Sequence, residues 1–221
     1  MDGQGKPVAA SKYTQEVSNH TLELYTLQLE APQGSVVIGI DEVGRGAVAG
    51  PLTVAAVALP ASPLIEGLDD SKKLSAARRE ELADTIHSVA LAIGIAHVEP
   101  QRIDSLGMAR ALRIAMLEAL AATKLEPDLL LLDGNPMGLH PAEQAIIKGD
   151  ASVACIAAAS IVAKVARDAI MITLDSACPG YDLAHNKGYA SAAHIKAIQE
   201  QGTSCEHRKT FCQNFFQGRL F

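Results

Sequence analysis

The sequence predicts an α/β sandwich, because apolar segments with strand character alternate along the chain with segments of helical periodicity. The strongest strand signal is residues 36–42, which begin with four β-branched residues in five positions. A second apolar run at residues 52–59 follows closely enough to form an antiparallel hairpin with the first. The alanine-rich segment 151–177 has the length of a long helix and ends before Pro179 and Gly180.

The other expected elements continue the same alternation. Ser75 is a good N-cap for the helix expected at residues 76–88. The remaining segments are a helix at 11–30 that ends before Pro32, a strand at 89–98, a helix at 107–122, a strand at 129–133, a short apolar segment at 146–150 and a helix at 190–201. We expect residues 1–33 to be an N-terminal extension with one helix, and residues 34–221 to be one domain that includes a C-terminal helical region.

Composition places the chain among globular proteins with a sizeable core, since 48% of its 221 residues are hydrophobic. No apolar run is long enough to span a membrane, and the N-terminus carries no apolar signal segment, so we expect a cytoplasmic protein. The four cysteines form no C-x-x-C pair, which predicts reduced thiols and no zinc site. The net charge of −6 argues mildly against a nucleic-acid partner, except for metal-dependent nucleases, whose acidic residues bind cations before substrate.

Acidic residues follow three of the apolar segments and indicate a metal site. Asp41 and Glu42 come where the first strand is expected to end. Asp133 closes a later strand, and Asp150 follows another short apolar segment. The plain alternative is that these acids only close strands or lie in solvated loops. Four carboxylates without interleaved histidine or cysteine suit Mg²⁺ or Mn²⁺, and two such ions about 3.5–4 Å apart catalyse phosphodiester hydrolysis.

Glycines flank an arginine directly after the first two acids. Gly44 and Gly46 surround Arg45, an arrangement that lets the main chain approach a phosphate closely. A dinucleotide-binding loop is the other interpretation, but its G-x-G-x-x-G fingerprint fails because the third glycine, Gly50, comes one residue late. Pro51 and an apolar run follow instead of a helix, so we favour a metal and phosphate site.

Seven motifs in a fixed order carry a family resemblance. They are Gly39-Ile40-Asp41-Glu42-Val43-Gly44-Arg45-Gly46, Asp70-Ser71-Lys72-Lys73-Leu74-Ser75, Leu132-Asp133-Gly134-Asn135, Lys148-Gly149-Asp150, Ala158–Asp168, His185-Asn186-Lys187-Gly188-Tyr189 and His207-Arg208. With these motifs the chain resembles the bacterial type 2 ribonucleases H, the ribonuclease HII family, over about residues 36–211. Ala47 departs from the family, which often has proline at that position, but no departure touches the acids.

The resemblance implies a ribonuclease H-like fold with a mixed central sheet flanked by helices. It implies an endonuclease that cuts the RNA strand of RNA–DNA hybrids. Such an enzyme also cuts duplex DNA on the 5′ side of a single embedded ribonucleotide, and it leaves 3′-hydroxyl and 5′-phosphate ends. The implied cofactor is Mg²⁺ or Mn²⁺, with two ions in the reactive complex, and the implied partners are nucleic acids and not membranes. We expect a monomer.

The resemblance also implies roles for individual residues. The catalytic and metal-binding residues would be Asp41, Glu42, Asp133 and Asp150. The substrate-binding residues would be Gly44, Arg45 and Gly46 at the ribonucleotide–deoxyribonucleotide junction, Lys72 near the scissile phosphate and Tyr189 stacked at the sugar that follows the ribonucleotide.

Other interpretations stay open from the sequence. A protein that binds RNA–DNA hybrids without cutting them would share the fold, and loss of an acid would favour it. A ribonuclease H-like recombinase or DNA nuclease is a third interpretation, which the Gly-Arg-Gly loop and Tyr189 disfavour.

Some single residues also have a purely structural interpretation. Without the neighbouring motif residues Lys187 and Gly188, Tyr189 would be interpreted as a half-buried packing residue. Lys164 and Asp168 are an i,i+4 pair expected to support the long helix, Arg167 has no assigned role, and His207-Arg208 has a structural or phosphate-positioning one.

Overall fold

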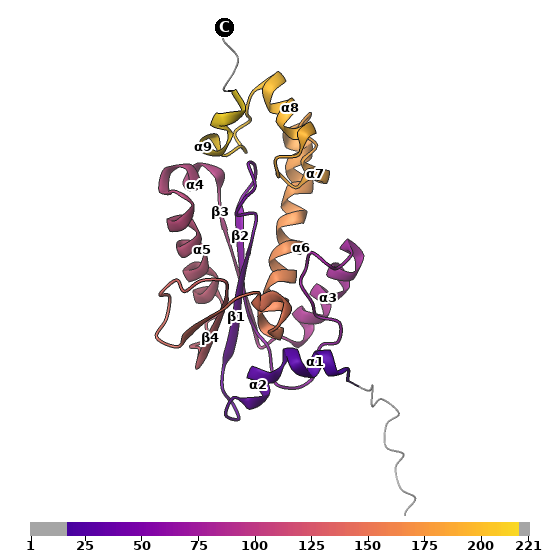
Figure 1. Ribbon diagram of the computed structural model, residues 1–221, viewed down its shortest axis with the longest axis vertical. Coiled ribbons are helices and arrows are strands. Elements are labelled where there is room, and N and C mark those ends of the chain that lie inside the picture. The colour runs from indigo at the N-terminus through magenta and orange to yellow at the C-terminus, as the bar shows by residue number, and fades with distance from the viewer. Residues whose placement is uncertain (1–16, 217–221) are drawn as a thin grey trace, which may run out of the picture.

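The computed structural model describes residues 17–216, and its centre is one five-stranded sheet with the strand order β3-β2-β1-β4-β5 (Figure 1). The strands are β1 (Val37–Val43), β2 (Leu52–Ala58), β3 (Ala92–Val98), β4 (Leu129–Asp133) and β5 (Glu143–Ile146). Strand β2 pairs antiparallel with both β1 and β3, whereas β4 is parallel to both β1 and β5. The expected mixed sheet and the hairpin of the first two strands are therefore confirmed.

Helices cover both faces of this sheet (Figure 1). One face packs against α3 (Ala76–Val89) and α6 (Ala154–Ala177), and the other against α4 (Pro100–Leu106) and α5 (Met108–Ala122). The short helices α1 (Asn19–Leu24) and α2 (Thr26–Glu30) lie at one end of the sheet, and a C-terminal group lies at the opposite end. That group consists of α7 (Leu183–Asn186), α8 (Ala192–Gln201), α9 (Lys209–Cys212) and a 3₁₀ turn, η2 (Gln213–Phe216).

The alternation of side chains along β1 divides the core into two apolar layers. Ile38 and Ile40 pack in the layer of α5, whereas Val37 packs in the layer of α6. Gly39 allows α6 to lie directly on the strand, because a Cβ at this position would come within 2.3 Å of the carbonyl carbon of Cys155. The small side chains in the first half of α6 suit this close approach of helix and sheet.

Two element boundaries differ from the prediction. The helix expected at residues 11–30 is two short helices, α1 and α2, in its described part, and residues 11–16 lie outside the described residues. The break is at Tyr25, which is fully buried and whose hydroxyl accepts a hydrogen bond from the main-chain N–H of Ile65 at 3.1 Å. The segment expected at 146–150 is the end of β5 followed by a 3₁₀ turn, η1 (Gly149–Ala151), and α6 starts only at Ala154.

Strand β1 extends further than predicted. It continues to Val43, so Asp41 and Glu42 lie inside the strand and pair with Ala55 and Val54 of β2. The acids therefore lie near the end of the strand, as expected, but the strand ends one residue later, because the β1–β2 ladder includes the pair Val43 and Thr53. Consecutive strand residues face opposite sides of the sheet, so the two side chains point in different directions.

Cys155, Cys178, Cys205 and Cys212 are all free in the structure, and their reduced state stays a prediction. Between residues 17 and 216, no helix combines the length and the apolar character needed to cross a membrane.

The described part of the N-terminal extension packs into the α6 layer through Leu24 and Tyr25. The domain division at residue 33 and the cytoplasmic location stay predictions.

Candidate active site

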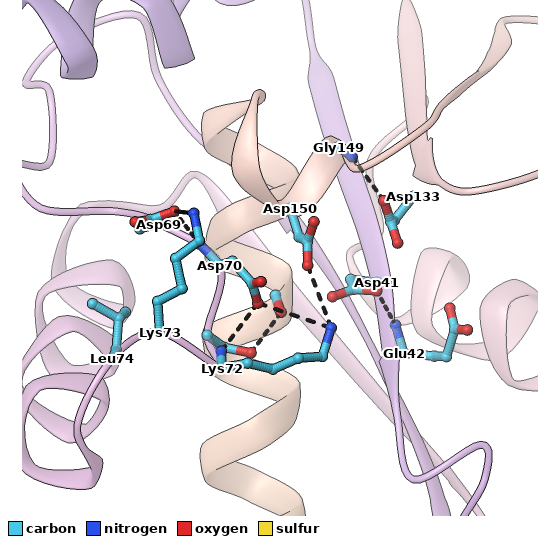
Figure 2. A network of polar contacts seen from close by, with 12 residues as sticks. Asp41, Glu42, Asp69, Asp70, Lys72, Lys73, Leu74, Asp133, Gly149 and Asp150 are labelled. Carbon is cyan, nitrogen blue, oxygen red and sulfur yellow. Dashed lines mark hydrogen bonds and ion pairs between the residues drawn. The ribbon is translucent and has the colours of Figure 1, made fainter.

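The four predicted acids come from three segments that meet beside β1 (Figure 2). Asp41 and Glu42 lie on β1, and Asp133 is the last residue of the neighbouring strand β4. Asp150 lies in η1, the turn that leads into α6. The main-chain N–H of Gly149 donates a hydrogen bond to Oδ1 of Asp133 at 2.7 Å, so the third and fourth acids are tied together by the turn itself.

Burial and mutual repulsion act on the two acids of β1. Asp41 is 7% exposed, and burial, reinforced by the nearby charges of Glu42 and Asp133, raises its pKa to about 8. Burial also raises the pKa of Glu42, an effect that Asp133 reinforces and the guanidinium of Arg45 opposes. The carboxylates of the two neighbouring strands are therefore close enough to influence each other's ionisation.

Lys72 supplies positive charge beside Asp150 (Figure 2). Its Nζ lies 3.6 Å from Asp150 and 3.9 Å from Asp70. Burial raises the pKa of Asp150 together with the charges of Asp133 and Asp70, whereas Lys72 opposes that rise. Partial burial favours the neutral form of Lys72, but the carboxylates of Asp70 and Asp150 outweigh it and raise the pKa of the ammonium group. The Lys72 side chain is 80% exposed and can therefore meet an anionic ligand.

Two adjacent cavities are each lined by predicted acids together with predicted substrate-binding residues. The larger has a volume of about 350 Å³, and the predicted residues that line it are Asp41, Glu42, Lys72 and Tyr189. The smaller, of about 200 Å³, shares Glu42 and adds Arg45 and Asp133. Asp150 joins this group through its contact with Lys72.

The Gly-Arg-Gly element lies just beyond the end of β1, and its two glycines have different tasks. Gly44 has φ +85°, and a Cβ there would come within 2.2 Å of Nε of Arg167, so packing inside the protein requires this glycine. Gly46 has open space where a Cβ would lie, which leaves its main chain free for a ligand. Arg45 is exposed and its Nη1 lies 3.6 Å from Oε1 of Glu42.

Comparison with known proteins then identifies the family. The family model described as Ribonuclease HII matches residues 38–217, which is most of the chain. The chain belongs to the ribonuclease HII family. A curated Ribonuclease HII from Cereibacter sphaeroides (strain ATCC 17029 / ATH 2.4.9) is 50% identical over 177 residues, which are 79% of this chain and 83% of the relative. Membership of the ribonuclease HII family makes this chain an enzyme, an endonuclease of the ribonuclease H type.

Solved structures agree with this assignment of the fold. The structure of the PCNA:RNase HII complex from Archaeoglobus fulgidus matches with 29% identity and a TM-score of 0.65, over 78% of this chain and 93% of that one. The crystal structure of Bst-RNase HIII in complex with Mn²⁺ matches with 18% identity and a TM-score of 0.61, over 92% and 71% of the two chains. This second likeness supports the ribonuclease H-like fold alone.

Two residues of α6 line the candidate site of this ribonuclease HII family member but had no predicted role in it. Ser160 and Lys164 line the larger cavity, and Ser160 lies within hydrogen-bonding reach of Asp41. Lys164 also forms the expected ion pair with Asp168, at 2.7 Å, so it both supports the helix and faces the site. The signal that could have found them is their i,i+4 spacing within the Ala158–Asp168 motif, which places both on one face of the helix.

The acids fit a divalent cation by their chemistry. In the described part of the chain, no three His, Cys, Asp or Glu side chains are already grouped closely enough to hold a metal ion. The carboxylates of Asp41 and Asp150 are nevertheless buried and have raised pKa values, in part because neighbouring carboxylates repel their charges. A cation among them would relieve that repulsion, and a set of oxygen ligands alone suits Mg²⁺ or Mn²⁺.

Proposed function

We propose that this ribonuclease HII family member is a metal-dependent endonuclease that cuts RNA–DNA hybrids and cuts duplex DNA on the 5′ side of a single ribonucleotide. The observation that carries the proposal is the coupled set of carboxylates, Asp41, Glu42 and Asp133, beside a cavity that also contains Tyr189. A catalytically inert hybrid-binding protein would not need buried acids with raised pKa values.

Asp41, Glu42, Asp133 and Asp150 would hold the metal. Two bound Mg²⁺ or Mn²⁺ ions would activate water and stabilise the leaving oxygen of the phosphodiester. The Mn²⁺ in the Bst-RNase HIII crystal structure agrees with this class of cofactor.

Other side chains of the site would bind and orient the nucleic acid. Lys72 would place its exposed ammonium group against the scissile phosphate. The open main chain at Gly46, next to Arg45, would contact the 2′-hydroxyl, the group that distinguishes RNA from DNA. Tyr189 is 38% exposed and would stack at the sugar after the ribonucleotide. One chain supplies all of these groups, so we propose that it acts as a monomer.

The test is cleavage of a labelled DNA duplex that contains one ribonucleotide, in Mg²⁺ and in EDTA. An all-DNA duplex and a long RNA–DNA hybrid are measured beside it. We expect cutting of both ribonucleotide-containing substrates in Mg²⁺ only, and an intact all-DNA duplex. Cutting of the hybrid alone would overturn the junction roles of Arg45 and Tyr189. Binding without any cutting would indicate the inert hybrid-binding protein, and equal cutting of all-DNA would indicate a DNA nuclease.

Tyr189→Ala is expected to slow cleavage at a single ribonucleotide by roughly 5- to 150-fold, because stacking on a nucleotide contributes about 1–3 kcal/mol. Binding to all-DNA duplex should change less. The measurement is kcat/KM on the single-ribonucleotide duplex, with Tyr189→Phe as the matched control that keeps the ring. A rate for Tyr189→Ala equal to the wild-type rate would remove Tyr189 from the substrate site.

A further inference from the structure

Two arginines are fully buried beside the proposed substrate loop. Arg167 lies on α6, and Arg208 lies just before α9. In the described part of the chain, the side-chain hydrogen bonds of both go to main-chain carbonyl oxygens. Buried arginines are usually paired with carboxylates, so two guanidinium groups held by carbonyls alone call for a specific reason.

Arg208 holds both ends of the loop that follows β1. Its Nη1 donates to the carbonyl of Arg45 at 3.1 Å, and its Nε and Nη2 donate to the carbonyl of Gly50 at 3.1 and 2.9 Å. Its main-chain N–H donates to the carbonyl of Val48 at 2.8 Å. One residue, 158 or more positions away in the chain, therefore fixes three carbonyls of residues 45–50.

Arg167 joins this loop to the loop that carries Tyr189. Its Nε and Nη2 donate to the carbonyls of Pro51 and Ala49 at 2.9 and 3.1 Å. Its Nη1 donates to the carbonyl of Lys187 at 2.8 Å, and its Cζ lies 5.5 Å from the centre of the Tyr189 ring. The same guanidinium group occupies the space that a Cβ at Gly44 would need.

A pair of buried histidines extends the connection from Arg208 to Tyr189. The main-chain N–H of Ser204 donates to Nδ1 of His207 at 3.0 Å, so the proton of neutral His207 is on Nε2. His207 can then donate to Nε2 of His194 at 3.0 Å, and Nδ1 of His194 donates to the carbonyl of Tyr189 at 2.9 Å. Burial lowers the pKa of both imidazoles, which agrees with this neutral, directional chain.

Burial of the two charged guanidinium groups is energetically unfavourable, so filling space in the core does not by itself explain why arginine is present at these positions. Burial and the charge of Arg167 lower the pKa of Arg208 to about 10. Apolar side chains of similar volume often replace buried charges without loss of stability. What such side chains could not supply is the set of donors that fixes carbonyls of two separate loops at once.

We propose that Arg167 and Arg208 are positioning residues that hold the Arg45–Gly46 main chain and Tyr189 in one fixed arrangement, and that this arrangement sets the specificity for a single ribonucleotide. The inference rests on the proposed function, because it assigns both loops to the substrate. A lone ribonucleotide offers one 2′-hydroxyl, so a displaced loop loses it. A long hybrid offers a 2′-hydroxyl at every position, so a displaced loop still finds one.

The test compares kcat/KM for the single-ribonucleotide duplex with kcat/KM for a long RNA–DNA hybrid. Arg208→Lys is the main variant, because lysine keeps the charge and loses the forked donor geometry. Arg167→Lys is the second variant. Arg102→Lys is the matched control, since Arg102 is an exposed arginine paired with Glu118 on the surface. The ratio of the two kcat/KM values does not depend on the fraction of folded protein, so a merely destabilised variant keeps the wild-type ratio.

We expect the ratio to fall at least tenfold in Arg208→Lys and Arg167→Lys, and to stay within twofold of wild type in Arg102→Lys. A ratio within twofold of wild type in both Arg208→Lys and Arg167→Lys would overturn the inference and leave the proposed function standing. Failure of the wild-type enzyme to cut the single-ribonucleotide duplex would instead overturn the proposed function, and the inference with it.

Discussion

Asp41→Asn is expected to abolish cleavage, lowering kcat roughly a thousandfold or more, and at the same time to stabilise the metal-free protein. The loss follows from the proposed metal site, because metal ions contribute several kcal/mol of transition-state stabilisation. The gain in stability follows from the burial of the Asp41 carboxylate. Asparagine keeps an oxygen that accepts the 2.7 Å hydrogen bond from the main-chain N–H of Glu42, but it removes a charge that the site disfavours without metal.

The gain in stability should depend on pH with a definite sign. The pKa of Asp41 is raised from 3.8 in the unfolded chain to about 8 in the fold, so the folded state binds this proton more tightly. Wild-type stability therefore falls as pH rises from about 4 to about 8, and this contribution is absent from the asparagine variant. In EDTA, the difference in Tm between Asp41→Asn and wild type should grow across that pH window.

The measurements are kcat on a hybrid and Tm in EDTA at several pH values. Asp84→Asn is the control, because Asp84 is exposed on α3 and has no part in the site. It should leave both quantities unchanged. Cleavage by Asp41→Asn at the wild-type rate in Mg²⁺ would refute the metal role of Asp41, and a lower Tm than wild type at pH 8 would refute the electrostatic account of its burial.

Gly39→Ala is expected to destabilise the fold strongly, with a loss of about 3 kcal/mol or more in the free energy of unfolding. The new Cβ would come within 2.3 Å of the carbonyl carbon of Cys155 and 2.4 Å of the main-chain nitrogen of Ile156. Both contacts are with the backbone of α6, which no side-chain rotation can relieve. The helix would have to move away from β1, and the acids that β1 and η1 carry would separate.

Denaturant unfolding measures this effect. Gly46→Ala is the matched control, because the space around Gly46 is open and its φ lies outside the left-handed region, so its midpoint should lie close to that of wild type. An unchanged unfolding midpoint for Gly39→Ala would contradict the direct packing of α6 on β1.

Local patterns in the sequence predicted most of the fold. The β-branched run of β1, the alanine-rich α6 and the N-cap at Ser75, whose side chain accepts from the main-chain N–H of Arg78, are all readable from neighbouring residues. The break at Tyr25 was missed, because it depends on a hydrogen bond from Ile65, 40 positions away. The end of β1 was placed one residue too early, because pairing with β2 extends the ladder to Val43.

In the candidate site too, the features that depend on neighbouring residues were predicted, and those that depend on distant residues were not. The acids were predicted as a set, since each follows an apolar segment and the family motifs include all four. The task of Gly44 could not be separated from that of Gly46, because it depends on Arg167, far along the chain. Arg167 and Arg208 had no predictable partners for the same reason, since their hydrogen bonds join residues 20 to 163 positions apart.

The chemistry of the cut ends tests the account most directly. A 5′-labelled strand with one ribonucleotide, in duplex DNA, is digested in Mg²⁺, and the labelled product is sized and offered to a DNA polymerase. Attack by water that bound metal ions activate predicts a product that ends immediately before the ribonucleotide, with a 3′-hydroxyl that the polymerase extends. A product that retains the ribonucleotide with a 2′,3′-cyclic phosphate would mean attack by the 2′-hydroxyl, and would contradict the proposed roles of the four acids.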